Sequence, residues 1–235
     1  MALPKLNSSP SYTTKIPSTG KEMNVRPFLV KEQKALLIAY ETQDRRDLAR
    51  AVVRTIHACV EQELPQNLPT FDVDYLFTQI RSKSVGETTE LQMYCQECNF
   101  DNLVTINLEE IEVSDAPDNN LLELTSSISV KMKYPSYEDI LKDPKIMDSK
   151  SPTETLLKMT SLCMDSILTE DDQYSLKDES SEEAIEFLES MTSEQFEKVT
   201  EYVNSIPSIN KKITFNCNEC GHHNEITLQG MDDFF

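Results

Sequence analysis

The sequence predicts an α+β fold built around a single metal site. Two C-x-x-C pairs, Cys95/Cys98 and Cys217/Cys220, each stand between segments in which apolar and polar residues alternate, as in half-buried strands. The long segment between the pairs is dominated by helical spacing, and only four glycines occur in 235 residues, which disfavours an all-β sandwich. We therefore expect an N-terminal β-hairpin and helices, a split four-cysteine zinc ribbon of short antiparallel strands, and a mainly helical insertion between the two knuckles.

Residues 1–27 are expected to form an extended arm followed by a β-hairpin. Residues 1–11 are rich in Pro, Ser and Asn, which favours an extended conformation. Tyr12–Ile16 and Glu22–Arg26 are short strand-like runs, and the Pro17-Ser18-Thr19-Gly20 sequence between them is typical of a turn.

Residues 28–86 are expected to form three helices, over Phe28–Glu41, from Asp44 onward, and from an N-cap at Asp72 to about Lys83. Each helix carries apolar residues at helical spacing, which predicts a buried stripe. The three stripes are Leu29, Leu36, Leu37 and Tyr40; Leu48, Val52, Ile56 and Cys59; and Val73, Leu76, Phe77 and Ile80.

Residues 87–134 and 211–235 are expected to form the zinc ribbon together. Thr88–Tyr94 leads as a strand into the first knuckle, and Lys211–Phe215 leads into the second. The strands that leave the two knuckles are marked by the apolar residues Val104, Ile106 and Leu108, and by Ile226 and Leu228. A further strand is predicted over Leu121–Tyr134.

Residues 135–210 are expected to form the helical insertion. The Ser151-Pro152-Thr153-Glu154 sequence predicts a helix start, with Ser at the N-cap, Pro at the first helical position and Glu at the third. The apolar face of that helix comprises Leu156, Met159, Leu162, Cys163 and Ile167. Residues 170–183 are acidic and rich in Ser, which indicates an exposed loop. Two short helices are predicted after it, over Glu182–Met191 and Ser193–Asn204.

The four paired cysteines have the spacing of a structural zinc site. Two C-x-x-C knuckles supply the four thiolates that one tetrahedral Zn²⁺ requires, and a closed thiolate set is structural rather than catalytic. Asn99 and Gly221 follow the second cysteines, where a knuckle must adopt the left-handed conformation that Asn and Gly tolerate best. Two separate redox pairs, a ligand role for His222 or His223, and iron in place of zinc remain open alternatives.

Composition and motifs argue against several classes of function. The formal net charge of −19 disfavours a nucleic-acid binder, and no apolar run reaches the roughly 18 residues of a membrane span. The Met1–Lys5 start lacks the apolar core of a secretory signal, so a reducing cytoplasm is expected. No phosphate-binding loop, dinucleotide fingerprint or hydrolase motif occurs. Hence we expect no catalytic and no cofactor-binding residues, with Cys59 and Cys163 as core residues.

The two ends of the chain are candidate contact segments. Phe234 and Phe235 either pack against the ribbon or are held out for a partner, since bare terminal aromatics favour association. We expect partner contacts at these two residues and at Leu3 and Leu6 of the N-terminal arm.

Several phrases along the chain resemble one protein family. They are Met1–Leu6, Pro17–Gly20, Arg26–Glu32, Tyr75–Phe77, Arg81–Glu87, the two knuckles and the terminal Phe-Phe. Together they resemble the baseplate hub assembly proteins of T4-like contractile-tailed bacteriophages. The resemblance implies a non-enzymatic role in building the central hub of the tail baseplate, with hub or tail proteins as partners. The protein would act in the host cytoplasm during assembly, as a transient factor or as a component retained in the particle.

Two other classes of function compete with this interpretation. A zinc-ribbon nucleic-acid-binding module, such as a transcription accessory factor, is compatible with the knuckles, but the negative charge opposes binding to phosphates. An enzyme with a Cys–His pair would need a reactive thiol of low pKa.

Overall fold

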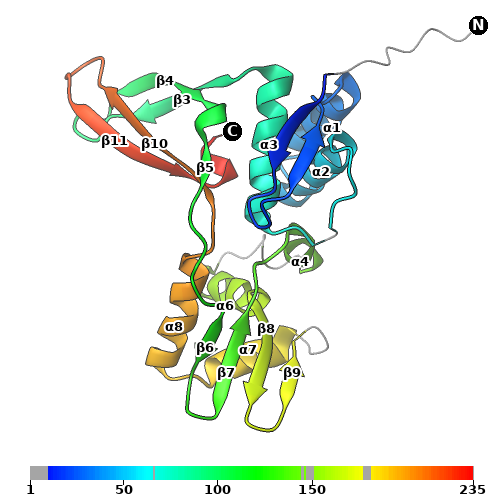
Figure 1. Ribbon diagram of the computed structural model, residues 1–235. Coiled ribbons are helices and arrows are strands. Elements are labelled where there is room, and N and C mark those ends of the chain that lie inside the picture. The colour runs from blue at the N-terminus through cyan, green and yellow to red at the C-terminus, as the bar shows by residue number, and fades with distance from the viewer. Residues whose placement is uncertain (1–9, 66, 144–145, 147–150, 177–180, 235) are drawn as a thin grey trace, which may run out of the picture. The chain divides into compact units, whose positions relative to one another are not determined.

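The computed structural model describes residues 10–65, 67–143, 146, 151–176 and 181–234, and it is α+β as predicted (Figure 1). The chain divides into two compact units. Unit 1 comprises Met1–Gln66, Phe71–Ser114 and Ser208–Phe235, and unit 2 comprises Asn67–Thr70 and Asp115–Pro207.

Unit 1 begins with the predicted β-hairpin and helices. Strand β1 (Tyr12–Lys15) pairs antiparallel with β2 (Glu22–Val25), and the helices are α1 (Val30–Glu41), α2 (Arg45–Cys59) and α3 (Thr70–Val85). Asp44 caps α2, because its carboxylate accepts a 2.8 Å hydrogen bond from the backbone N–H of Arg46. The apolar stripe of α2 is turned inward, with Val52, Ile56 and Cys59 buried.

The face that α1 buries differs from the expectation. Leu29, Leu37 and Tyr40 are 45%, 55% and 68% exposed, so the predicted stripe of this helix is wrong. Glu32 and Ala39 are buried instead. Apolar residues occupy more than one side of α1, and spacing alone therefore did not select the side that packs.

Helix α3 begins earlier than expected. Its first residue is Thr70, so Asp72 lies within the first turn rather than at the N-cap. The Asp72 side chain is fully buried and accepts a 2.9 Å hydrogen bond from the backbone N–H of Ser18, in the β1–β2 turn. Tertiary contact therefore explains this acidic residue better than capping does. The predicted stripe of Val73, Leu76, Phe77 and Ile80 is buried.

Two hairpins complete unit 1. Strand β3 (Thr88–Tyr94) pairs with β4 (Asp101–Asn107), and β10 (Ile209–Asn216) pairs with β11 (His223–Gln229) and with the short β5 (Glu112–Val113). The short helices η1 (Leu108–Glu110) and η2 (Met231–Asp233) follow β4 and β11. Their shared core consists of Met93, Ile106, Leu108, Ile111, Ile209, Ile213, Leu228 and Phe234.

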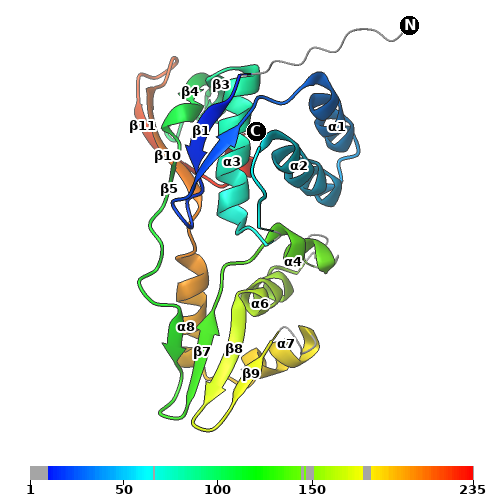
Figure 2. The ribbon, with the colours of Figure 1, turned by 45° about the vertical axis from the view of Figure 1, so that its right-hand side comes forward.

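Unit 2 is a four-stranded antiparallel sheet with helices. The strands β6 (Leu121–Glu123), β7 (Ile128–Met132), β8 (Met164–Thr169) and β9 (Gln173–Ser175) are neighbours in that order. The helices are α4 (Tyr137–Lys142), α6 (Pro152–Leu162), α7 (Ser181–Glu189) and α8 (Ser193–Asn204), of which the last three lie on one face of the sheet (Figure 2). The core comprises Val130, Met132, Cys163, Met164, Leu188, Val199 and Tyr202.

Three predictions inside unit 2 were wrong in detail. The expected strand Leu121–Tyr134 is a hairpin, whose turn is held by a 3.0 Å hydrogen bond from the Ile128 N–H to the Thr125 hydroxyl. Helix α6 has the predicted Ser151 cap but ends at Leu162, and Ile167 pairs with Val130 in the sheet. The acidic segment 170–183 contains strand β9, although residues 177–180 lie outside the described residues. Pairing with β7 and β8 outweighs the local preference of these segments.

Candidate metal centre

The four predicted cysteines meet at the tips of the two hairpins of unit 1. Their Sγ atoms all lie within 4.8 Å of one another. Two close approaches join the two hairpins: Cys95 Sγ lies 3.7 Å from Cys220 Sγ, and Cys98 Sγ lies 3.5 Å from Cys217 Sγ. Four sulfurs bound tetrahedrally at about 2.3 Å from one zinc ion lie about 3.8 Å apart. The cluster therefore has the dimensions of a zinc site with four thiolate ligands.

The first knuckle is shaped by its backbone. The Cys95 N–H donates to the Phe100 carbonyl at 2.9 Å, and the Asn99 N–H donates to the Cys95 carbonyl at 2.9 Å. Asn99 has φ of 57°, the left-handed conformation expected from the sequence.

The second knuckle repeats this geometry. The Cys217 N–H donates to the His222 carbonyl at 2.9 Å, and the Gly221 N–H donates to the Cys217 carbonyl at 3.0 Å. Gly221 has φ of 72°, which confirms the second left-handed turn. The two knuckles therefore share the same turn geometry.

Two buried asparagines cross-link the knuckles, and sequence reasoning missed them. The Asn102 side chain accepts a 2.9 Å hydrogen bond from the Asn218 N–H, and its Nδ2 donates to Cys217 Sγ at 3.7 Å. Asn224 does the same in reverse: it accepts from the Gln96 N–H at 2.9 Å, and its Nδ2 donates to Cys95 Sγ at 3.6 Å. Each asparagine stands four residues after the second cysteine of its own knuckle, and this shared position is the signal that could have found them.

The thiols of each knuckle differ in acidity. Desolvation opposes ionisation of Cys217, but hydrogen bonds from the backbone N–H groups of Cys220 and Glu219 outweigh it and lower its pKa to about 6. Cys95 is also lowered: desolvation opposes ionisation there too, and the N–H groups of Cys98 and Glu97 reduce the pKa.

The second cysteine of each knuckle shows the opposite shift. The Phe100 N–H lowers the pKa of Cys98, but desolvation and the surrounding sulfurs raise it to about 12. For Cys220, the His222 N–H and Cys98 lower the pKa, but desolvation and the sulfurs of Cys217 and Cys95 together outweigh them, so the pKa is raised. Four thiolates cannot gather here without a cation, and a divalent ion would supply the charge that compensates them.

The two histidines of the second knuckle lie beside the cluster and are exposed. The cluster of potential ligands found among the described residues contains four cysteines and neither His222 nor His223. The Nδ1 atom of His223 is 2.9 Å from the Asn216 side-chain oxygen, across the β10–β11 pair.

Comparison with known proteins identifies the family. The model of the T4 bacteriophage base plate protein family matches residues 9–235. The chain belongs to this family. No curated protein and no solved structure matches it at significant similarity. Family membership confirms the resemblance seen in the sequence and gives the chain a structural role in the phage baseplate.

The remaining two cysteines of this baseplate protein are core residues, as predicted. Cys59 and Cys163 are buried in unit 1 and unit 2, respectively. Desolvation raises the pKa of Cys59 to about 11 and that of Cys163 to about 12, so both thiols stay protonated at neutral pH. Among the described residues, no helix combines the length and the apolar character that crossing a bilayer requires.

The expected contact residues of the baseplate protein are only partly described. Phe234 is completely buried in the core of the two hairpins, so its side chain is not free for a partner and that expectation is corrected. The ring packs inward because removing its apolar surface from water stabilises the folded state. Leu3, Leu6 and Phe235 lie outside the described residues.

Proposed function

We propose that this baseplate protein is a non-enzymatic hub assembly factor or minor hub component that acts through protein–protein contacts. We further propose that one structural zinc ion holds its two knuckles together. The observation that carries the proposal is the closed four-sulfur cluster in a chain whose family is that of phage baseplate proteins. The protein would act in the host cytoplasm during assembly.

The ligand set supports a structural rather than a catalytic metal. Cys95, Cys98, Cys217 and Cys220 would fill all four positions of a tetrahedral ion, which leaves none for water or substrate. Bound zinc would supply the charge that lets four thiolates coexist. Asn102 and Asn224 would hold two of these sulfurs in place, as polar groups behind a metal ligand commonly do.

The contacts with hub proteins are proposed at the two ends of the chain. Leu3 and Leu6 stand in the Pro- and Ser-rich N-terminal arm, and Phe235 is the last residue. The resemblance to hub assembly proteins includes both of these segments. An acidic chain whose knuckles are held together by zinc could cover an interface of a hub subunit until the next component binds.

Metal analysis of the purified protein and co-expression with the hub proteins of the same phage test this proposal. We expect one zinc ion per chain, and hub complexes that form in the presence of the protein and fail without it. Removal of residues 1–11, or of Phe235 alone, should weaken complex formation while leaving the zinc content unchanged. Hub assembly that proceeds equally well without the protein would reject the proposed function, and iron in the four-cysteine site would reject zinc.

A further inference from the structure

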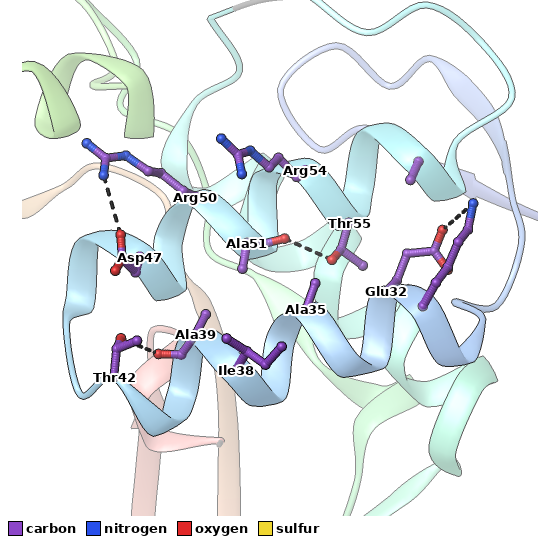
Figure 3. Close-up of a pocket in the computed structure, with 12 residues that line it drawn as sticks. Glu32, Ala35, Ile38, Ala39, Thr42, Asp47, Arg50, Ala51, Arg54 and Thr55 are labelled. Carbon is purple, nitrogen blue, oxygen red and sulfur yellow. Dashed lines mark hydrogen bonds and ion pairs between the residues drawn. The ribbon is translucent and has the colours of Figure 1, made fainter.

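A groove of about 510 Å³ runs between α1 and α2. Figure 3 shows Ala35 and Ala39 of α1 and Ala51 of α2 lining it, with Arg50 and Arg54 extending from α2 beside it. Its volume lies within the range of roughly 300–1,000 Å³ that is typical of ligand pockets. All of its lining residues belong to unit 1.

The α1 side of the groove is unusually apolar for an exposed surface. Ile38 lines the groove and is 51% exposed, and Val30 and Leu37 on the same helix are 79% and 55% exposed. Of these three side chains, only Leu37 was expected from the sequence to be buried. A helix that leaves several large apolar residues in water offers a surface for another protein.

The residues that line the groove include three cations and two carboxylates. Lys31, Arg50 and Arg54 line it, and the structure records no ion pair between Arg54 and any other described residue. Asp47 lies 3.4 Å from Arg50, and Glu32 lies 3.0 Å from Arg26 and 3.3 Å from Lys31, so among the described residues Arg54 is the lining cation that has no ion pair. In a chain of net charge −19, residues 30–59 carry six Lys or Arg residues against four Asp or Glu residues.

We propose that the groove between α1 and α2 binds an acidic amphipathic helix of another baseplate protein. This inference deepens the proposed function and rests on it, since the partner is taken to be a baseplate component. The small side chains of Ala35, Ala39 and Ala51 let a third helix approach to the usual interaxial distance of about 8–10 Å. Apolar residues of that helix would contact Ile38, and flanking carboxylates would face Arg50 and Arg54.

The cations and the apolar lining of the groove together favour an acidic amphipathic helix over other partners. A nucleic acid would satisfy the arginines but not the exposed Ile38, Val30 and Leu37. A second copy of the chain is a poorer match, because its acidic helices α7 and α8 already bury their own apolar residues. Leu188 and Val199 on those helices are 2% and 0% exposed in the core of unit 2.

A labelled synthetic peptide tests the groove directly. The probe is a helix with Leu at positions i, i+3, i+4 and i+7 and Glu on both flanks of that stripe, titrated against the full zinc-loaded chain by fluorescence anisotropy. Arg54→Glu and Ile38→Ser should each weaken binding by about tenfold or more. Binding should also weaken as NaCl rises from about 0.1 M to about 1 M, where charge interactions are screened within about 3 Å.

Matched variants away from the groove control for charge and hydrophobicity. Lys21→Glu makes the same charge change in the β1–β2 turn, and Leu103→Ser removes an apolar side chain that is 60% exposed on β4. Both should bind the peptide as the wild type does, and circular dichroism should show all variants folded. Equal binding of a peptide with Lys in place of Glu, equal or tighter binding of a DNA duplex, or unchanged binding by Arg54→Glu would each overturn the inference.

Co-expression with the hub proteins separates this inference from the proposed function. If the Ile38→Ser, Arg54→Glu double variant keeps its zinc but no longer supports hub complexes, the groove is the contact. If hub complexes form normally with this variant, the groove inference fails and the proposed function stands. A wild-type dimer in light scattering that Arg54→Glu dissociates would assign the groove to self-association and also overturn it. Failure of the wild type to affect the hub would reject the proposed function.

Discussion

At the scale of single residues, the candidate metal centre depends on side chains that are not ligands. Asn102 and Asn224 each hold the knuckle opposite their own through one acceptor and one donor contact. Both side chains are buried, at 2% and 0% exposure, so an unpaired amide there would be costly. The four cysteines could be predicted from spacing, because ligand spacing is a local property. The asparagine pair could not be assigned so readily, because its partners are more than 100 positions away.

Replacing either asparagine should weaken metal binding without removing a ligand. Asn102→Ala leaves the Asn218 N–H and Cys217 Sγ without their partner, and we expect zinc affinity to fall by about 10- to 100-fold. Asn102→Asp should be at least as damaging, because it places a negative charge next to the thiolates. Competition with a chromogenic chelator measures the affinity. Asn218→Ala is the control, because Asn218 contributes its backbone N–H, and an equal loss there would contradict this role.

At the scale of elements, sequence patterns identified helices and strands better than they identified faces. The cap at Ser151 and the two knuckle strands follow from local residue types, and the structure has them. The buried side of α1 was misassigned because its packing depends on Glu32 and Ala39, neither of which is large and apolar. Ile167 was placed on a helix because helical and strand spacing cannot be distinguished over so short a run. Tertiary packing determines the buried side of α1, and strand pairing determines the conformation at Ile167.

Glu32, at the start of α1, is predicted to make the stability of the folded protein decrease at acid pH. Desolvation opposes ionisation of Glu32, but hydrogen bonds from Arg26, the Leu29 N–H and Lys31 outweigh it and hold its pKa below the ordinary value of 4.5. The folded state therefore binds this proton less readily than the unfolded state. The stability that Glu32 contributes is complete above about pH 4.5, and it is lost as the pH falls through the lowered folded-state pKa.

Glu32→Gln tests this dependence. The amide loses the charged partner of Arg26, so the free energy of unfolding should fall by about 1–3 kcal/mol at neutral pH. Below about pH 4.5 the difference from the wild type should shrink, because the carboxylate of the unfolded wild type then binds a proton, and it should be lost once the pH falls below the lowered folded-state pKa. Thermal melts across this pH range measure the effect. Glu41→Gln, at the exposed end of the same helix, should change little, and an equal loss there would show that the Arg26–Glu32 contact is unimportant.

The C-terminal segment is predicted to be part of the ribbon core. Phe234 follows η2 and is completely buried among core residues such as Ile209 and Leu228. Phe234→Ala should lower the free energy of unfolding by about 3–5 kcal/mol, because it removes a large ring from a packed core. Phe100→Ala, at a site 41% exposed, is the control and should cost much less. Urea denaturation of both variants measures the difference, and similar losses would contradict the assigned packing.

At the scale of the whole molecule, the candidate metal site joins segments that lie on either side of unit 2 in the sequence. The chain leaves unit 1 after β5, forms the main part of unit 2 over Asp115–Pro207, and returns at β10 to complete the cluster. Each unit has a hydrophobic core made of its own residues. The four cysteines that would bind zinc all belong to unit 1, so loss of the metal should affect the two units differently.

Removing the metal should unfold the two hairpins and spare unit 2. Zinc binding in small structural sites is worth on the order of 10 kcal/mol, which is comparable to the whole stability of a domain. A chelator, or Cys95→Ser or Cys217→Ser, should therefore abolish amide-exchange protection in β3, β4, β10 and β11. Amides of β7 and β8 should stay protected, because Val130, Met164 and their neighbours form a core that needs no metal. Cys59→Ser changes a cysteine outside the cluster and should keep the zinc. Full protection of all four hairpin strands in the metal-free protein would show that packing alone holds the ribbon and that the site is not structural.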